Sequence, residues 1–428
     1  MAMPRVKSLS KKLAVKLYLD THFTVSSLAE TFRTKRKSNL IHENRQPAEL
    51  VVVMALYEKG LLRKDVEKFL TALKKKGAMI IAANTSALAK AETERVSHLI
   101  DVYIERDNLG RDFGSYKECF DYFYQNKINQ HCKRLIICND SVFYSTDGLD
   151  VFIEEMVKTE KNVLGATENH DIERHLGSFF ISVSEKVVNS KKFIDYWSNY
   201  KKTNVRPKII KNGELGLSRV LKSLSCGDDD FVSLYNAHSI EKQTTNIRDI
   251  IKLISLMRDG DAFSGSSISL QDRFCENIVI DSYFKKYMKG ILILKHKNYY
   301  LNEDYYNDEM DNGSHFISFL EWLDHLAVPG SEPSKDLVTA LKSVCIELIV
   351  QGSQIHLNGL VFRKMGLPII KLDLLYRCAY SMFDIIRLSE LISDGQEAEE
   401  FKKIIFARPA GKNFHFGFKK LAFKHGYI

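Results

Sequence analysis

The segment Leu50-Val-Val-Val-Met-Ala-Leu56 decides the fold class, because it is a continuous apolar run rich in β-branched residues. Such a run is typical of a strand that is buried on both faces of a parallel sheet. An amphipathic helix over 61–76 is predicted next, and Gly77 ends it. Residues 78–83 repeat the buried-strand pattern and stop at the polar Asn84. This succession predicts a parallel βαβ unit.

The alternation continues along the chain and enlarges the sheet. Four further elements are predicted in the order helix, strand, helix and strand: 87–97, 99–104, 115–126 and 134–138. The predicted fold class is therefore α/β, an open and mostly parallel sheet flanked by helices. Polar clusters at 84–86, 105–112 and 139–141 follow predicted strands. Ligands of such sheets bind at the carboxyl ends of the strands, so we expect the site there.

The rest of the chain is predicted to flank this sheet. The expected regions are a helical basic extension, a catalytic sheet domain, a mainly helical region and a basic aromatic tail: 1–47, 48–240, 241–400 and 401–428. Within them, residues 1–33 are predicted to be helical and 34–48 to be a polar connection. Residues 335–350 and 372–394 carry the pattern of amphipathic helices.

Composition indicates a soluble globular protein. The 428 residues, 45% hydrophobic and 27% charged, suit two or three domains. There is no run of 18 or more apolar residues, and the basic N-terminus lacks the apolar core of a signal peptide. The seven cysteines are scattered without metal-ligand spacing, which favours buried thiols in a reducing compartment. We therefore expect a cytoplasmic protein.

The net charge of +8 is concentrated at the two ends of the chain. Such a bias suits nucleic acid, anionic lipid or a nucleotide ligand. The charge makes a nucleic-acid-binding protein the rival class. No RNP, helix-turn-helix or zinc-finger pattern accompanies the charge, so no nucleic-acid partner is expected.

The segment from Arg106 to Tyr116 is the most informative motif. Gly110 and Gly114 flank Arg111 and Asp112 where a strand gives way to a helix. Glycine lets the backbone approach a ligand closely, and an arginine fork beside a helix N-terminus suits a phosphate. The motif predicts a nucleotide site, and a solvated turn that caps the helix is the alternative.

Four blocks, in chain order, carry a resemblance to a known family: Asn108-Leu-Gly-Arg-Asp-Phe-Gly114, Asn139-Asp-Ser141, His175-Leu-Gly-Ser-Phe-Phe-Ile181 and Gly366-Leu-Pro-Ile-Ile-Lys-Leu372. From about residue 48 to 376 their order and spacing resemble the rhamnan synthesis protein F family. The resemblance implies a GT-A-like sheet and a glycosyltransferase of bacterial surface polysaccharide, of the O-antigen or capsule type. It implies a nucleotide-diphosphate donor that carries rhamnose or another hexose. A catalytically silent scaffold of a polysaccharide assembly complex is the alternative.

The expected donor site follows from the motif and the resemblance together. It comprises the residues Asn84, Asn108, Arg111, Asp112, Tyr116, Asn139, Asp140 and Ser178. GT-A enzymes place a metal-binding acidic motif where Asp140 stands, and Mn²⁺ or Mg²⁺ suits its oxygen ligands. Asn139 and Ser141 replace the further acids of stricter motifs. His238 is the expected further metal ligand, with a surface or core histidine as the alternative.

Glu214 begins a predicted helix and resembles the acceptor-side base of inverting GT-A enzymes, although the usual second acid is Leu215 here. A carboxylate that only favours the helix N-terminus is the alternative. His175 is expected in the sugar pocket, because it lies in a matched block.

The tail from Arg408 to Ile428 interleaves basic and aromatic residues, which suits an anionic membrane surface or a nucleic acid, and an enzyme that acts on a lipid-linked glycan would need the former. Phe414 and Phe418 would lie on one helical face with Leu421. We therefore expect peripheral contact with the inner face of the cytoplasmic membrane and a lipid-linked glycan acceptor. A tail packed on its own domain is the alternative.

Overall fold

The structure is a computed structural model, and it describes residues 3–33, 38–258, 269–295, 314–326, 333–408 and 411–428. Its centre is a sheet with eight strands among the described residues, in the spatial order β1 (Asn39–Glu43), β4 (Val102–Glu105), β3 (Met79–Asn84), β2 (Leu50–Leu56), β5 (Arg134–Asn139), β10 (Phe180–Ser184), β7 (Val163–Gly165) and β11 (Phe231–Ser233). Strands β4, β3, β2 and β5 run parallel, as do β7 and β11. Strands β1 and β10 run antiparallel to their neighbours. The predicted open, mostly parallel sheet is confirmed.

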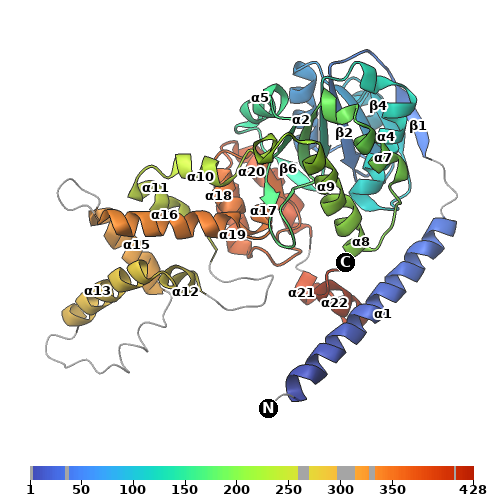
Figure 1. Cartoon of the computed structure of the whole chain (residues 1–428). Coiled ribbons are helices and arrows are strands. Elements are labelled where there is room, and N and C mark those ends of the chain that lie inside the picture. The colour runs from blue at the N-terminus through green and yellow to red at the C-terminus, as the bar shows by residue number, and fades with distance from the viewer. Residues whose placement is uncertain (1–2, 34–37, 259–268, 296–313, 327–332, 409–410) are drawn as a thin grey trace.

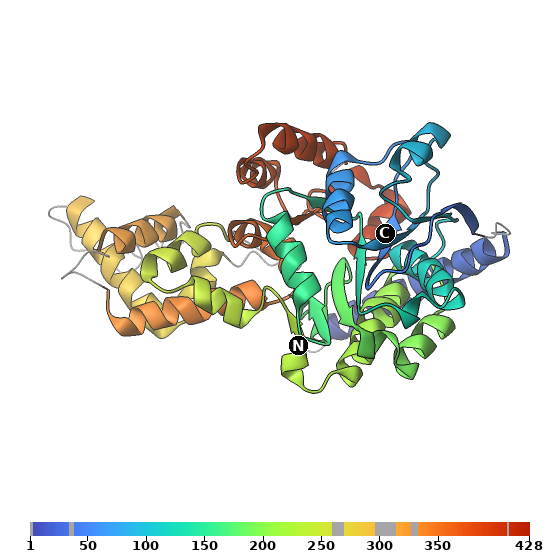
Figure 2. The ribbon, with the colours of Figure 1, turned by 90° about the horizontal axis from the view of Figure 1, so that it is seen from above.

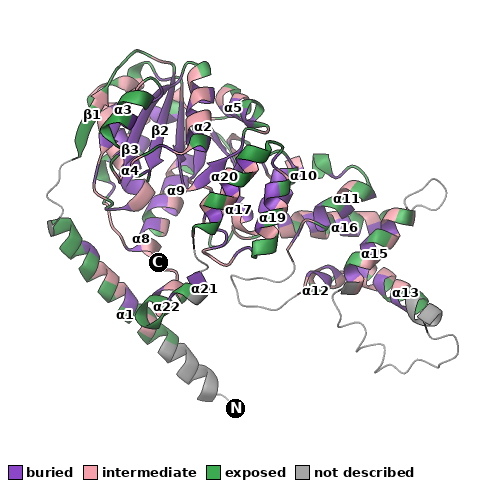
Figure 3. Cartoon of the chain, turned by 180° about the vertical axis from the view of Figure 1, so that it is seen from behind, coloured by how far each residue is buried: buried purple, intermediate pink, exposed green. Residues whose placement is uncertain are grey.

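Helices cover both faces of the sheet. Successive residues of β2 point to opposite faces, and its apolar side chains are buried on each of them. Val52 and Met54 pack with side chains of the helices α2 (Lys64–Lys75), α3 (Lys90–Val96) and α5 (Leu149–Lys158). Val51 and Val53 pack with the helices α4 (Arg111–Gln125), α7 (Lys191–Asn199) and α9 (Leu215–Leu224). The strands are therefore buried on both faces (Figures 1 and 3). The predicted buried strands over 50–56 and 78–83 are confirmed by β2 and β3.

Two predicted elements were wrong. Residues 34–48 were expected to be a polar connection, but β1 pairs with β4 through contacts such as Glu43 with Val102. Four of the five residues of this edge strand are exposed and the fifth is partly buried, so its sequence needs no apolar pattern. Residues 372–394 were expected to be helical, but only α19 (Met382–Glu390) is, and the preceding residues form turns that pack Leu374 and Tyr380 into a core.

The mainly helical region projects sideways from the sheet (Figures 1 and 2). It contains α10 (Ala237–Gln243), α11 (Ile247–Ile254), α12 (Leu270–Cys275), α13 (Ile278–Lys295), α15 (Ser314–Leu326) and α16 (Lys335–Val350). The predicted helix over 335–350 is confirmed by α16. The chain then returns to the sheet through α17 (Gln354–Leu357), α18 (Gly359–Lys364) and β12 (Ile369–Lys371). Because β12 pairs with β6 (Val142–Tyr144), it brings C-terminal residues beside the end of β5.

Short elements complete the described chain: η1 (Ile128–Gln130), β8 (Glu168–Asn169), β9 (His175–Leu176), α6 (Glu185–Val188), α8 (Arg206–Ile209), η2 (Ile210–Glu214), η3 (Asp228–Asp230), α20 (Gly395–Phe406), α21 (Gly411–Phe414) and α22 (Gly417–Lys424). Strands β8 and β9 form a separate antiparallel pair. Four of the seven cysteines are buried and two are partly buried, whereas Cys226 is exposed. The expectation of buried thiols is therefore wrong for Cys226.

The predicted N-terminal helix is α1 (Met3–Arg33), and the tail packs against it (Figure 1). The ring of Phe23 stacks 6.0 Å from that of Phe418 and 5.2 Å from that of Tyr427. Phe414 ends α21 and Phe418 belongs to α22, so the expected single helical face for these two residues was wrong. In the described ranges, no helix has both the length and the apolarity that crossing a membrane requires.

Candidate functional site

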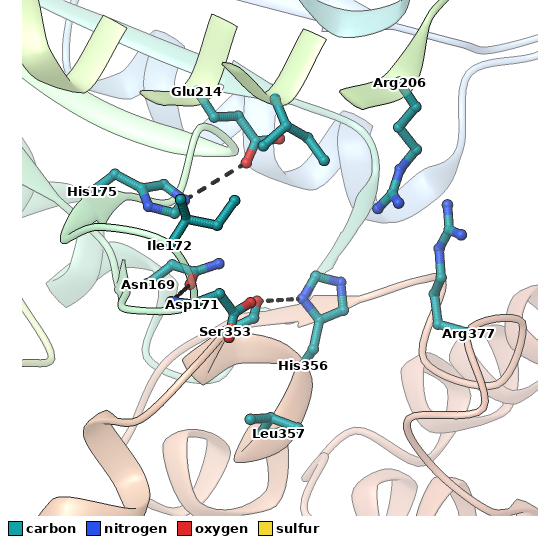
Figure 4. A pocket seen from close by; sticks show the side chains of 11 residues that line it. Asn169, Asp171, Ile172, His175, Arg206, Glu214, Ser353, His356, Leu357 and Arg377 are labelled. Atoms are coloured by element: carbon teal, nitrogen blue, oxygen red, sulfur yellow. Dashed lines mark hydrogen bonds and ion pairs between the residues drawn. The ribbon is translucent and has the colours of Figure 1, made fainter. Parts of the chain in front are cut away.

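A cavity of about 450 Å³ lies at the carboxyl ends of the parallel strands. Its wall is built from strand ends, the start of α4, the α8–η2 turn and the C-terminal region: Leu56, Tyr57, Thr85, Asn108, Arg111, Asp112, Phe113, Ser141, Ser178, Arg206, Ile209, Ile210, Glu214, His356, Lys371, Asp373, Arg377 and Arg408. A second cavity of about 430 Å³ adjoins it, and His175 lines this second cavity but not the first. Figure 4 shows this second cavity. Because Arg206, Glu214 and Arg377 line both, the two cavities meet at these residues.

The loop before α4 is held in shape by the buried guanidinium of Arg106. It donates hydrogen bonds to Arg111 O at 3.2 Å, to Ser115 Oγ at 2.9 Å and to Leu109 O. A Cβ on Gly114 would overlap Leu109 O and this guanidinium. The prediction that Gly114 lets the backbone approach a ligand was wrong, because the space beside it is filled by Arg106.

Arg111 has an uncommon backbone conformation. Its φ is +50°, in the left-handed region that favours glycine, and it follows Gly110 with φ of +90°. Such conformations are strained in residues with side chains and persist where the surroundings impose them. Here the conformation begins α4 and sets the Arg111 side chain on the cavity wall. Burial and then the nearby charge of Arg377 lower the pKa of Arg111.

Asn139, at the end of β5, is the centre of a polar network behind the wall. Its Nδ2 donates to Tyr116 Oη at 3.0 Å and to Asp112 Oδ2 at 3.4 Å. The Tyr116 hydroxyl in turn donates to Ser178 O at 2.9 Å. Since Tyr116 and Asn139 are buried and absent from the wall, they support Asp112 and Ser178 rather than facing the cavity.

The same network reaches the C-terminal region. Ser141 Oγ donates to Asn139 Oδ1 at 2.6 Å, and Lys371 Nζ donates to Ser141 Oγ at 2.9 Å. Burial and the charge of Asp140 raise the pKa of Asp112 to about 6, although Lys371 opposes this shift. The Asp112 carboxyl therefore holds its proton more tightly than an exposed aspartate does.

Asp140 is buried beside the cavity and does not line it. Its Oδ2 accepts a hydrogen bond from Tyr57 N at 2.5 Å, and its carbonyl oxygen accepts one from Arg63 at 3.0 Å. Arg63 Nε also lies 3.3 Å from Glu58 Oε1 and 3.0 Å from Asp65 Oδ1. Burial and then the charges of Asp140 and Asp65 raise the pKa of Glu58 to about 8, while Arg63 opposes them. Asp140 therefore belongs to a buried network of one cation and three carboxyl groups.

Two further predicted residues lie off the wall. Asn84 is buried at the end of β3, where its amide bonds to the backbone N and O of Glu58 at 3.0 and 2.8 Å. His238 lies on α10 with its side chain 70% exposed, 3.9 Å from Glu241. The structure does not bring Asp140 and His238 together in either cavity. Among the described residues, no cluster of three His, Cys, Asp or Glu side chains is arranged to hold a metal ion.

Glu214 lies where the two cavities meet. It ends η2, a π-helical turn, directly before α9, and such turns often occur at functional sites. Its Oε2 is 3.9 Å from Nε2 of the buried His175 (Figure 4). His175 Nδ1 is 2.8 Å from Glu173 O. Because a carbonyl only accepts, Nδ1 carries a proton and His175 turns its other nitrogen toward Glu214.

The sequence did not point to the C-terminal residues of the wall. His356 Nδ1 is 2.8 Å from Ser353 Oγ, and its Nε2 is 3.0 Å from Asp373 Oδ1. Burial alone would raise the pKa of Asp373, but His356, Lys371 and Arg377 hold it well below its usual range. The only signal for this region was the block from Gly366 to Leu372, which ends one residue before Asp373.

Three comparisons with known proteins bear on this arrangement. Residues 79–244 match the family model described as Rhamnan synthesis protein F. The chain is 28% identical over 221 residues to the uncharacterized protein y4gN of Sinorhizobium fredii (strain NBRC 101917 / NGR234), an alignment that covers 50% of this chain and 56% of that protein. The chain thus spans little more than half the length of this curated relative.

The glycosyltransferase GlyE in Streptococcus pneumoniae TIGR4, known from a crystal structure, aligns with 45% of this chain and 46% of its own, at 15% identity and a TM-score of 0.26. The matched segment 79–244 includes β3, the Arg111 loop, the end of β5, His175 and Glu214. The resemblance that the sequence blocks predicted is therefore confirmed for residues 79–244, which match the Rhamnan synthesis protein F family.

Proposed function

We propose that this chain is a glycosyltransferase that moves a sugar from a nucleoside diphosphate sugar to a growing bacterial surface polysaccharide. The observation that carries the proposal is the cavity at the sheet edge, lined by five cationic side chains: Arg111, Arg206, Lys371, Arg377 and Arg408. Arginine forks and lysine ammonium groups bind phosphate oxygens through charge-assisted hydrogen bonds. Part of this wall lies within the segment that matches the Rhamnan synthesis protein F family.

Each of the two adjoining cavities would hold one of the two substrates. The donor diphosphate would lie in the cavity lined by Asn108, Arg111 and Asp112, and the acceptor sugar in the cavity lined by His175. Glu214 faces both, so it accepts the proton of the acceptor hydroxyl as that oxygen attacks the anomeric carbon. The bond from that carbon to the diphosphate breaks, and the diphosphate leaves with the bonding electron pair. Rhamnose or another hexose is the proposed donor sugar, and an O-antigen or capsule glycan the proposed product.

Arg111→Ala tests the donor site. We expect this variant to bind its preferred nucleoside diphosphate about 1.5–3 kcal/mol more weakly, the scale of a hydrogen bond to a charged group. Calorimetry with UDP, dTDP and GDP measures the affinity, and a panel of the corresponding nucleotide sugars measures transfer and hydrolysis. The control is Arg248→Ala, which removes a half-exposed arginine that pairs with Asp324 in the helical region.

Unchanged nucleotide affinity in folded Arg111→Ala protein would remove this residue from the donor site. Nucleotide binding without transfer or hydrolysis of any nucleotide sugar would favour a catalytically silent scaffold of an assembly complex. Absence of nucleotide binding in the unaltered protein would overturn the proposed function.

We also propose that the acceptor is lipid-linked and that the enzyme works at the inner face of the cytoplasmic membrane. Support comes from α1, which leaves one stripe of large apolar side chains exposed: Leu13, Leu17, Val25, Leu28 and Phe32. Figure 3 shows exposed residues along the outer side of this helix. In the tail, Phe416 is 78% exposed near the basic Lys419, Lys420 and Lys424. Apolar and basic side chains together suit an anionic lipid surface.

A Leu17→Ser, Leu28→Ser, Phe416→Ser triple variant is expected to lose most of its binding to anionic vesicles, because it removes apolar contacts from both elements. Vesicle flotation at low and high salt measures this, and Ile278→Ser, at an exposed apolar site on α13, is the control. Point substitutions are preferable to deleting the tail, since Arg408 lines the cavity and Arg206 and Arg377 bond to Gly426 and Ile428. Undiminished flotation of the triple variant would place the membrane contact elsewhere.

A further inference from the structure

The wall of the donor cavity carries more positive than negative charge. Its cationic side chains are Arg111, Arg206, Lys371, Arg377 and Arg408, and its carboxylates are Asp112, Glu214 and Asp373. With all of these ionised, five cations face three carboxylates, which leaves an excess of two positive charges. A nucleoside diphosphate sugar carries one negative charge on each of its two phosphates. The cavity and this ligand are therefore matched in charge without any added ion.

The arginines of the wall are close enough to repel one another. Arg206 and Arg377 point toward each other across the neighbouring cavity (Figure 4). Burial, followed by the charges of Arg377 and Arg111, lowers the pKa of Arg206 to about 10. The fold nevertheless keeps them in place, because Arg206 donates to Gly426 O at 3.1 Å and Arg377 to Ile428 O at 2.6 Å. An anion placed between these guanidinium groups would relieve the repulsion.

Two carboxylates at or beside the donor cavity, Asp140 and Asp373, are committed to other partners. Asp140, the predicted ligand, is buried, and its Oδ2 accepts a hydrogen bond from Tyr57 N at 2.5 Å. Asp373 lies 3.0 Å from His356 Nε2 and 3.4 Å from Arg377 Nε. Oxygen-ligated metals are held by free carboxylate oxygens, so these residues do not fit the predicted Mn²⁺ or Mg²⁺ site.

We propose that Arg111, Arg206 and Arg377, and not a divalent metal, neutralise the diphosphate of the sugar donor. The inference rests on the proposed function and concerns how the same cavity works. When the bond to the sugar breaks, negative charge grows on the departing diphosphate, and guanidinium groups already held around it stabilise that charge. Arg377 comes from the C-terminal region, so residues beyond the segment 79–244 complete the donor site.

Calorimetry with UDP, dTDP and GDP tests this, first in EDTA and then with MnCl₂. We expect the best-bound nucleoside diphosphate to keep its affinity within about threefold in EDTA, and we expect sugar transfer to persist there. Arg377→Ala should weaken that binding by at least about tenfold, which corresponds to ~1.4 kcal/mol. Arg377→Lys keeps the charge but loses the planar fork, so it should fall between the two. The control is Arg248→Ala, which should bind as the unaltered protein does.

Binding or transfer that disappears in EDTA and returns with MnCl₂ would overturn metal independence and leave the proposed function standing. Failure of every nucleoside diphosphate to bind, with or without MnCl₂, would instead overturn the proposed function. If Arg377→Ala does not fold, nucleotide affinity of Arg206→Gln and the EDTA comparison on the unaltered protein still test whether arginines or a metal neutralise the diphosphate. Unchanged affinity in a folded arginine variant would overturn the role assigned to that arginine.

Discussion

Replacing Glu214 with Gln is expected to lower kcat by about 10²–10⁴, the usual contribution of a general base, while nucleotide affinity changes little. Gln keeps the shape of the side chain but cannot accept the proton of the acceptor hydroxyl. Glu214 is well placed for this role, because it faces both cavities and His175 Nε2 lies 3.9 Å from its carboxylate. Steady-state transfer rates and calorimetric nucleotide affinity, measured on the same preparation, check the expectation.

The matched control is Glu173→Gln, since Glu173 pairs with Arg219 at 2.8 Å and does not line either cavity. Its kcat is expected to stay close to that of the unaltered protein. A Glu214→Gln variant that transfers sugar at an undiminished rate would exclude the base role. The anomeric configuration of the product is an independent check, because a product that retains the donor's configuration requires no such base.

Replacing Arg63 with Met is expected to lower the free energy of unfolding by about 3–5 kcal/mol, since it leaves buried carboxyl groups without their cation. Arg63 Nε lies 3.0 Å from Asp65 and 3.3 Å from Glu58, and its guanidinium also bonds to the carbonyl oxygens of Asp140 and Val142. Urea unfolding followed by circular dichroism measures the loss.

The loss should grow as pH rises. Burial raises the pKa of Glu58 to about 8 in the folded protein, above its value in the unfolded chain. Folding therefore favours the protonated carboxyl in the unaltered protein, and this contribution is lost as pH rises from about 4.5 to 8. Arg63 lowers the pKa of Glu58, so removing Arg63 raises this pKa further, and the additional loss in Arg63→Met grows as pH rises through about 8. A second substitution, Asp65→Asn, should restore part of the stability of Arg63→Met because one buried charge disappears.

The control for this network is Arg248→Met, at a half-exposed arginine that pairs with the half-exposed Asp324. Exposed ion pairs add little to stability, so this variant should unfold close to the unaltered protein. If both arginine variants lost the same free energy of unfolding, or if Asp65→Asn restored none of it, the charges of the network would not be what stabilises the fold.

The central sheet was predictable because its parallel strands are buried on both faces and must be apolar throughout. Leu50–Leu56 and the run over 78–83 became β2 and β3 as predicted. The edge strand β1 was missed for the opposite reason, since its residues Asn39–Glu43 are mostly exposed and obey no apolar pattern. Pairing with β4, which is distant in sequence, makes this segment a strand.

The sequence predicted residues of the cavity wall where neighbours in sequence are also neighbours in space. Asn108, Arg111 and Asp112 lie on the wall because they stand together where the chain passes from the end of β4 into α4. The prediction of wall residues was less complete where the direction of a side chain decided whether it faces the cavity. Asp140 follows the correct strand but turns into a buried network with Arg63, and Tyr116 and Asn139 lie behind the wall.

The sequence by itself determined the α/β class, the edge of the sheet where the candidate site lies and the resemblance of residues 79–244 to the Rhamnan synthesis protein F family. These depend on local patterns, namely apolar runs, the polar residues that end them and short blocks of fixed order. Only the tertiary structure decided which charges meet in the cavity. Lys371 and Arg377 reach Ser141 and Arg206 because β12 pairs with β6 after the chain has passed through the helical region. Contacts between segments so far apart depend on the packing of the whole chain, which no local pattern records.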